Sequence, residues 1–324
     1  MIIKQNYHTN KIHDQEEYLI SYANLKGNLI KYQKDFLDLK SLNNFYVNRH
    51  FGFPQCLPLN IKYFDYSKSR IFKIDKKEFS KKIFETKNLN YVGVKKFFRY
   101  GTYFASEVKL KEKYENKFYK YLNQIIYLKK KVSNLKKKHK KICSMQIRNV
   151  PHLGHEAIFK FLINKFDLVV LNPIFGIKKK NDFSSSYISI ALTYIENKYK
   201  KIRFLPFPSN FYYAGPREAL HHMNLREMLG FNFFYIGRDH AGAENLYPAE
   251  NAVKIVKKFS RKFKIKSVTS AGGFFCKKCK KYLIKYSCRH KALVDISGTQ
   301  FRSCLRKRKL YIHADENLQK KLFN

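Results

Sequence analysis

From residue 142 onward the chain alternates strand-length apolar runs with helix-length amphipathic segments, and this alternation limits its fold more than any other feature. The apolar runs occupy residues 142–145, 168–171, 202–205 and 233–236. The helical patterns that follow them occupy residues 156–166, 187–199, 216–229 and 249–263. Short strands separated by helices of this length form a parallel sheet with crossover helices. The sequence therefore predicts an α/β domain with a parallel sheet that binds ligands beyond the carboxyl ends of its strands.

The first 127 residues lack this rhythm and are rich in Tyr, Phe and Lys. Within them, residues 101–110 partly alternate apolar and polar side chains, which predicts a strand. A helical pattern over 115–128 then leads into eight lysines between Lys129 and Lys141. This lysine run has two interpretations, a solvated linker or a polyanion-binding patch.

The net charge is extreme, because 66 Lys and Arg residues face 24 Asp and Glu residues, giving +42. Such a surplus usually indicates a nucleic-acid or anionic-membrane partner. Only 13 of the 66 cations are Arg, however, and nucleic-acid recognition depends heavily on the planar guanidinium. We therefore interpret the charge as a compositional bias and expect no specific nucleic-acid partner.

Nothing in the sequence indicates a membrane or secreted protein. The apolar runs are far shorter than the ~20 residues that a membrane helix needs. The first 18 residues carry Lys, His, Asp and Glu and no apolar signal-peptide core. Half of the six cysteines cluster between Cys276 and Cys288, as in a metal site of a reducing compartment. We expect a cytoplasmic protein with no membrane partner.

Residues 146–155 read Gln-Ile-Arg-Asn-Val-Pro-His-Leu-Gly-His and join a predicted strand to a predicted helix. A helix N-terminus offers free N–H groups to a phosphate, and Gly154 would let the phosphate approach the backbone. A guanidinium binds an oxyanion through two parallel hydrogen bonds, and amides and imidazoles add donors. The candidate ligands of an anion are Gln146, Arg148, Asn149, His152 and His155.

Three further stretches lie at predicted strand–helix junctions or helix starts. They are Tyr-Ala-Gly-Pro-Arg-Glu-Ala at 213–219, Gly-Arg-Asp-His-Ala-Gly at 237–242 and Ile-Ser-Gly-Thr-Gln-Phe-Arg at 296–302. Gly237 and Gly242 permit tight turns and close approach of a ligand, and Arg238 and His240 supply positive or donor groups. Each stretch alone is a weak signal.

Together and in this order, the four stretches resemble the ATP sulfurylase (sulfate adenylyltransferase) family. His-x-Gly-His and Ile-Ser-x-Thr-x-x-Arg also occur in the wider nucleotidylyltransferase superfamily, whereas the other two stretches are similar to sulfurylases in particular. The resemblance covers about residues 141–322. It extends faintly over 85–110, which is similar to the end of the family's PUA-like N-terminal domain.

The resemblance implies roles for individual residues. Gln146, Arg148 and the backbone of Ala241 match the family's sulfate contacts. The positions that match its ATP-binding groups are Gln146, Ile147, Arg148, Asn149, His152, His155, Gly237, Arg238, Asp239 and His240. The catalytic candidates among them are Arg148, Asn149, His152, His155 and Arg238. The chain departs from the family at Ile147, where Thr is usual, and at Tyr212, where a basic residue is common.

The sequence also predicts a metal site. The spacing Cys276-x2-Cys279-x8-Cys288-x-His290 offers three thiolates and an imidazole, which suits a closed, structural, tetrahedral Zn²⁺ site. Some ATP sulfurylases carry a similar site just before the Ile-Ser-Gly-Thr stretch. We interpret the isolated Cys56, Cys143 and Cys304 as core residues.

With the resemblance, these observations imply a PUA-like N-terminal domain (1–138), a Rossmann-like catalytic domain (139–264) and a zinc-bearing C-terminal subdomain (265–324). The resemblance implies that ATP, carried with Mg²⁺, and sulfate react reversibly to adenylyl sulfate and pyrophosphate. It also implies a homo-oligomer, and we expect no fused adenylyl-sulfate kinase. Two alternatives remain: another nucleotidylyltransferase of the His-x-Gly-His type, and a non-catalytic basic protein that binds polyanions.

Overall fold

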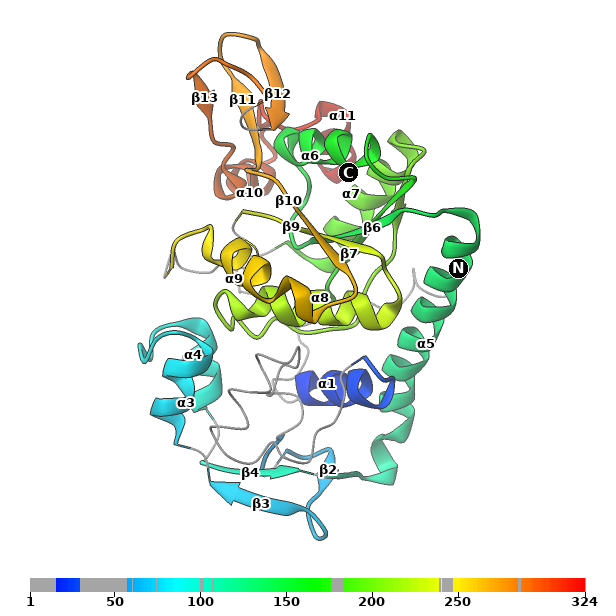
Figure 1. Cartoon of the computed structure of the whole chain (residues 1–324), viewed down its shortest axis with the longest axis vertical. Coiled ribbons are helices and arrows are strands. Elements are labelled where there is room, and N and C mark those ends of the chain that lie inside the picture. Colours follow the sequence, from blue (N-terminus) through cyan, green and yellow to red (C-terminus); the bar gives the residue numbers. More distant parts are fainter. Residues whose placement is uncertain are drawn as a thin grey trace.

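The computed structural model describes residues 16–29, 57–59, 61–73, 75–99, 102–106, 108–175, 183–238, 240, 247–284 and 287–323 (Figure 1). The helices are α1 (Glu16–Lys26), α3 (Lys76–Ile83), α4 (Val92–Phe98), α5 (Glu115–Lys138), α6 (Leu153–Ile163), α7 (Ser185–Lys198), α8 (Arg217–Leu229), α9 (Asn251–Phe259), α10 (Gly298–Arg306) and α11 (Glu316–Phe323). The strands are β1 (Leu57–Pro58), β2 (Phe64–Asp65), β3 (Arg70–Lys73), β4 (Tyr103–Ser106), β5 (Lys109–Leu110), β6 (Ile142–Ile147), β7 (Leu168–Pro173), β8 (Ile202–Phe204), β9 (Phe233–Ile236), β10 (Lys266–Thr269), β11 (Gly273–Cys276), β12 (Lys281–Ile284) and β13 (Leu293–Val294). Among these described residues, no helix is long and apolar enough to span a membrane.

A five-stranded parallel sheet forms the centre of the molecule, with the order β10-β9-β6-β7-β8. The first strand in the sequence, β6, therefore lies in the middle, and the chain winds outward from it in both directions. The prediction of an α/β fold with a parallel sheet is confirmed, and each of the four predicted strands is present. In such a sheet the reversal of strand order, here between β6 and β9, opens a crevice at the carboxyl ends of these two strands.

Helices cover both faces of this sheet, because alternate side chains of a strand point to opposite faces. On one face Cys143 and Met145 of β6 pack with Phe159 of α6 and Leu192 of α7. On the other face Ile142 of the same strand belongs to a core that includes residues of α8 and α9. Burial on both faces explains why the strands are continuously apolar.

The N-terminal region contains short antiparallel strands, in one sheet ordered β1-β4-β3 and one pairing β2 with β5. The predicted strand at residues 101–110 corresponds to β4 and β5. Side chains of α1, α3, α4 and α5 share a single hydrophobic core with α8, which packs on the parallel sheet. This β structure does not by itself confirm a PUA-like domain.

The interpretation of the lysine run as a linker is wrong, because α5 continues unbroken through Lys138 (Figure 1). Leu128 and Val132 are buried one turn apart on this helix, and this apolar stripe continues the helix through the lysines. Most of the lysines lie on the exposed face, while Lys129 donates to the carbonyl oxygen of Gly27 at 2.6 Å. In the sequence, the many lysines hid the helical spacing of the few apolar residues in this segment.

The C-terminal region contributes a strand to the parallel sheet, forms a second sheet of its own, and ends in two helices with a small core. Strand β10 pairs in parallel with β9, so the five-stranded parallel sheet extends to Thr269, beyond residue 264. The strands β12, β11 and β13 then form a separate antiparallel sheet. The helices α10 and α11 pack through Phe301, Leu305 and Leu318 in a small core that also includes Ala191 of α7.

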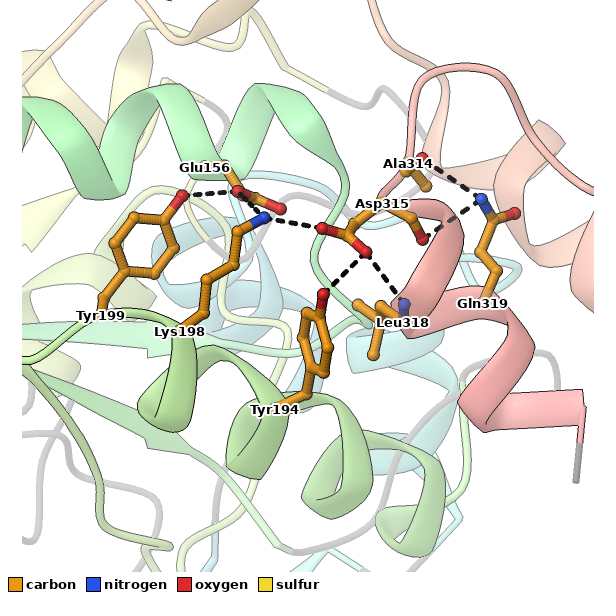
Figure 2. Close-up of polar contacts among 8 residues, drawn as sticks. All are labelled: Glu156, Tyr194, Lys198, Tyr199, Ala314, Asp315, Leu318 and Gln319. Carbon is orange, nitrogen blue, oxygen red and sulfur yellow. Dashed lines mark hydrogen bonds and ion pairs between the residues drawn. The ribbon is translucent and has the colours of Figure 1, made fainter.

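A polar cluster at the edge of the core attaches the C-terminal segment to the helix that begins at the His-x-Gly-His stretch (Figure 2). Lys198 donates to Glu156 of α6 at 2.8 Å and to Asp315 at 2.6 Å. Tyr199 donates to the same Glu156 oxygen, and Tyr194 donates to Asp315. Asp315 also accepts the N–H of Leu318 in the first turn of α11. The cluster therefore fixes α6, α7 and α11 relative to one another.

Replacing Lys198 by Met should lower the free energy of unfolding by about 2 kcal/mol, on the scale of a hydrogen bond to a charged group. The loss follows because Glu156, which is buried, and Asp315, which is partly buried, would lose their shared cation. Urea unfolding would measure it, with Lys200→Met as the matched control on the exposed end of the same segment. Equal stability of the two variants would contradict the structural role of this cluster.

Candidate functional site

A cavity of about 230 Å³ lies at the carboxyl ends of β6 and β9, where the order of the strands reverses. It combines the ends of two neighbouring strands with the start of α6. Its lining residues are Met145, Gln146, Ile147, Arg148, Asn149, His155, Ile158, Phe211, Tyr235, Gly237, Arg238, His240 and Gly272. The cavity therefore gathers side chains from two of the stretches singled out in the sequence.

Several lining residues carried no signal in the sequence. Phe211 comes from the loop before α8, and Gly272 lies between β10 and β11. Neither follows a strand of the predicted pattern directly, so only the folded chain brings them to this crevice. The guanidinium of Arg148 lies 5.9 Å from the centre of the Phe211 ring, and the aromatic face helps to orient it.

The two histidines of the His-x-Gly-His stretch are held together at the N-terminus of α6. Their ring centres are 4.0 Å apart, and His152 is the residue that caps the helix. The backbone N–H of His152 donates to Nδ1 of His155 at 3.3 Å. Because Nδ1 of His155 accepts this hydrogen bond, a neutral His155 carries its proton on Nε2 and can donate it to a ligand.

Two polar atoms near the cavity are buried and have no hydrogen-bond partner among the described residues. They are the side-chain oxygen of Gln146 and Nδ1 of His152. Since the oxygen and nitrogen of an amide are interchangeable by a flip, Gln146 can offer either atom. Buried polar atoms without partners are uncommon in folded proteins and fit a site that is completed by a polar ligand.

The β9 side of the cavity carries Gly237, Arg238 and His240. Arg238 is partly exposed, and its Nη2 lies 3.8 Å from a carboxylate oxygen of Asp295. His240 is buried, with Nε2 3.0 Å from Nδ1 of His222 on α8. The predicted site residues Asp239 and Ala241 lie outside the described residues.

The segment 296–302 is hydrogen-bonded to the segment 146–155. Ser297 caps α10 by accepting the N–H of Gln300, as its helix-start pattern predicts. One turn later, Arg302 donates from Nη1 to the side-chain oxygen of Asn149 at 3.2 Å and from Nη2 to Thr299 at 3.0 Å. Asn149 is therefore oriented by a residue about 150 positions away, which the sequence alone could not pair with it.

Gly154 serves a packing role that differs from the one expected. A Cβ atom built on Gly154 would lie 2.9 Å from the carbonyl oxygen of Gly273, and one built on Gly273 would lie 2.0 Å from that of Gly154. Both positions therefore need glycine so that the start of α6 and strand β11 can touch through their backbones. The space near Gly154 that we expected a phosphate to use is occupied, at least in part, by β11.

The four predicted metal ligands form one cluster, with ligand atoms that all lie within 4.8 Å of one another. Cys276 Sγ lies 3.7 Å from Cys288 Sγ and 3.5 Å from Nδ1 of His290, and Cys279 Sγ lies 3.3 Å from Cys288 Sγ. The N–H of Cys279 points at Cys276 Sγ and lowers the pKa of that thiol, favouring the thiolate. This arrangement fits a metal ion held by three sulfurs and one nitrogen.

The imidazoles around the cavity are neutral at pH 7, because burial in the protein disfavours their charged form. Burial lowers the pKa of His155 to about 4 and that of His152 to about 2. It also lowers the pKa of His221 on α8 to about 3, and those of His222 and His240 well below the usual value. The positive charge beside the cavity therefore comes from Arg148 and Arg238.

The reversal of strand order and the polar crevice beside it define an α/β protein of the nucleotide-binding type. Residues 126–311 match the family model for ATP-sulfurylase, so the chain belongs to the ATP-sulfurylase family.

Similar proteins include the sulfate adenylyltransferases of Pyrococcus abyssi (35% identical) and Ignicoccus hospitalis (34% identical). Each alignment covers 72% of this chain, and the chain spans 63% and 62% of the length of these two relatives. Among solved structures, the hexameric APS kinase from Thiobacillus denitrificans is similar over 68% of this chain and 44% of that chain, with a TM-score of 0.49 and 12% identity.

The buried histidines predict that the protein loses stability in mild acid. Their folded pKa lies below the unfolded value of about 6.5, so only the unfolded chain binds protons as the pH falls below it. Stability should be complete above pH 7 and fall between pH 6.5 and 4, by up to about 1.4 kcal/mol per pH unit for each histidine. Urea unfolding across this range would measure the slope. His155→Asn should make it shallower, and a stability that stays constant from pH 8 to 5 would contradict the burial of these rings.

Proposed function

We propose that the protein is a sulfate adenylyltransferase, which converts ATP and sulfate reversibly to adenylyl sulfate and pyrophosphate. The observation that carries this proposal is the cavity at the reversal of strand order, which Gln146, Arg148, His155 and Arg238 line together. Anion-binding groups from separate strands converge there on one space. The similarity of the chain to proteins named sulfate adenylyltransferase also supports this proposal.

In the proposed reaction a sulfate oxygen attacks the α-phosphorus of ATP. The new S–O–P linkage forms as the bond between the α-phosphorus and the bridging oxygen breaks, and pyrophosphate leaves with that electron pair. No proton transfer or covalent enzyme intermediate is required. The protein therefore has to hold two anions in line and to neutralise the charge that develops on the leaving group.

Arg148 and Gln146 would bind sulfate, with the backbone of Ala241 as a third contact. The Phe211 ring supports this role for Arg148 by restricting the guanidinium. His155 would donate from Nε2 to the phosphates, together with His152, Asn149 and Arg238. Ile147, Gly237, Asp239 and His240 would complete the nucleotide site.

Mg²⁺ bound to the ATP phosphates would supply further positive charge to the leaving pyrophosphate. We also propose that the Cys276 cluster binds structural Zn²⁺, since three thiolates and an imidazole leave no open position for a substrate. Reduced thiols in this cluster support a cytoplasmic location. The domain division expected from the sequence, including the PUA-like N-terminal domain, and a homo-oligomeric state are part of this proposal.

A sulfate-dependent exchange of labelled pyrophosphate into ATP by the purified protein tests the reaction directly. Exchange should require both sulfate and Mg²⁺. Exchange without sulfate, or exchange supported by another acceptor such as a nucleotide monophosphate, would assign the chain to a different adenylyl-transfer reaction.

Arg148→Lys should lower kcat/KM for sulfate at least ~100-fold, on the scale of losing one preorganised oxyanion donor. The ammonium of Lys cannot make the two parallel hydrogen bonds of a guanidinium. The KM for ATP should change far less, because the phosphates would still contact His155 and Arg238. Arg203→Lys, the same change on β8, serves as the control. Near-normal sulfate kinetics in Arg148→Lys would show that residues 146–149 are not the sulfate site.

Metal analysis should find about one Zn per chain, and Cys279→Ser should abolish most of this content. Because β11 carries both Cys276 and the glycine that touches Gly154, loss of metal should loosen the C-terminal sheet first. Hydrogen exchange of β11 and β12 would report this loosening. Cys304→Ser, outside the cluster, should retain the metal. Metal-free protein with an unchanged melting curve would rule out a structural metal.

A further inference from the structure

A chain of buried polar side chains runs from the core of α8 to the wall of the cavity. Glu218 and His222 lie one turn apart on α8, and neither is exposed to solvent. Oε1 of Glu218 lies 3.2 Å from Nε2 of His222, and Nδ1 of His222 lies 3.0 Å from Nε2 of His240. His240 in turn lines the cavity. None of the sequence patterns assigned a role to His222.

The carboxylate at the start of this chain has a fixed orientation. Oε1 accepts the N–H of Tyr212 at 3.0 Å, and Oε2 accepts the N–H of Ala214 at 2.9 Å. These bonds close a turn in which Tyr213 and Gly215 adopt the left-handed conformation. Burial raises the pKa of Glu218, but two N–H donors on separate oxygens favour the ionised carboxylate.

An ionised Glu218 determines where the protons of the two imidazoles lie. Nε2 of His222 makes no hydrogen bond among the described residues, but a carboxylate oxygen 3.2 Å away electrostatically favours a proton on this nitrogen of a neutral His222. Nδ1 of His222 is then an acceptor. It can bond to Nε2 of His240 only if that nitrogen carries a proton, which leaves Nδ1 of His240 without one.

Burial and the surrounding charges keep the rings of His222 and His240 neutral. Each ring therefore retains one protonated and one unprotonated nitrogen. Arg226 is fully buried on the same helix, with its guanidinium 5.0 Å from the Phe207 ring and 5.2 Å from the Phe234 ring. Burial and the charge of Arg226 lower the pKa of His222 and of His240, and Arg148 across the cavity adds to the effect on His240. Of the charged groups facing His240, only Glu218 opposes this shift.

We propose that Glu218 and His222 are positioning residues that hold His240 as its Nε2–H tautomer, so that its Nδ1 is an acceptor for a donor group of the nucleoside. A ribose hydroxyl and an exocyclic amine are donors of this kind, whereas a phosphate oxygen is not. His240 then recognises the nucleoside, in contrast to the donor role that the sequence suggested for it. Only the identity of the ligand as ATP rests on the proposed function.

Nuclear magnetic resonance of the full chain with 15N-labelled imidazoles tests the tautomers without reference to activity. At pH 7.5, Nε2 of His240 should carry the proton and should show a scalar coupling to Nδ1 of His222 across the hydrogen bond. His221→Phe is the matched control. His221 directly precedes His222 in the sequence, is also buried, and packs against the Tyr212 ring. This variant should retain the coupling. An unprotonated Nε2 on His240 in the natural chain would overturn the proposal.

Binding measurements separate positioning from packing. His222→Phe should weaken ATP binding by ~10-fold, by analogy with the loss of a group that orients a metal-binding histidine. His222→Asn should restore most of the affinity, because its side-chain oxygen can accept the Nε2–H of His240 in place of Nδ1. Equal losses in both variants, measured on samples with matched melting temperatures, would reduce His222 to a packing residue and overturn the proposal.

Tripolyphosphate, which lacks the nucleoside, is the second probe. Its affinity should change less than about twofold in His222→Phe, because the phosphate-binding groups are untouched. An equal loss for ATP and tripolyphosphate would overturn the nucleoside role of His240. Absence of sulfate-dependent exchange in the natural chain would instead refute the proposed function while leaving the tautomer experiment interpretable.

Discussion

The parallel pairing of β6 with both β7 and β9 is the constraint on which the rest of the structure depends. Because β6 lies in the middle of the sheet, the connections on its two sides diverge and leave a crevice at its carboxyl end. Gln146, Arg148 and Asn149 are the residues with which β6 ends and the chain leaves the sheet. Their position at the crevice follows from the strand order and not from contacts among themselves.

The start of α6 connects this crevice to the C-terminal region through three different interactions. The backbones of Gly154 and Gly273 touch, Arg302 orients Asn149, and the carbonyl oxygen of His313 accepts the N–H of Leu153. Backbone contact tolerates no side chain, so it couples the strand that carries Cys276 directly to the His-x-Gly-His helix. A structural metal here would therefore affect the cavity although it lies outside it.

The electrostatic character of the cavity is set by burial more than by the +42 net charge of the chain. Its histidines are neutral, and one nitrogen of each ring has a protein partner: Nδ1 of His155 accepts from the backbone, and Nε2 of His240 faces Nδ1 of His222. Neutral rings with fixed tautomers can distinguish donor from acceptor groups of a ligand. In the proposed function Arg148 and Arg238 would supply the charge that binds the anions, so recognition and charge neutralisation would be divided between different side chains.

The sequence by itself determined the parallel α/β sheet, its four predicted strands and the gathering of Cys276, Cys279, Cys288 and His290, because hydrophobic periodicity and ligand spacing are local patterns. It also identified much of the cavity lining, since strand ends in such a sheet converge on one edge. The prediction of a linker at the lysine run was wrong, because the many charged residues concealed the helical spacing of Leu128 and Val132, which are buried. Only the tertiary structure decided the contacts of Gly154 with Gly273, of Asn149 with Arg302 and of His222 with His240, because each joins segments whose proximity depends on the packing of the whole domain.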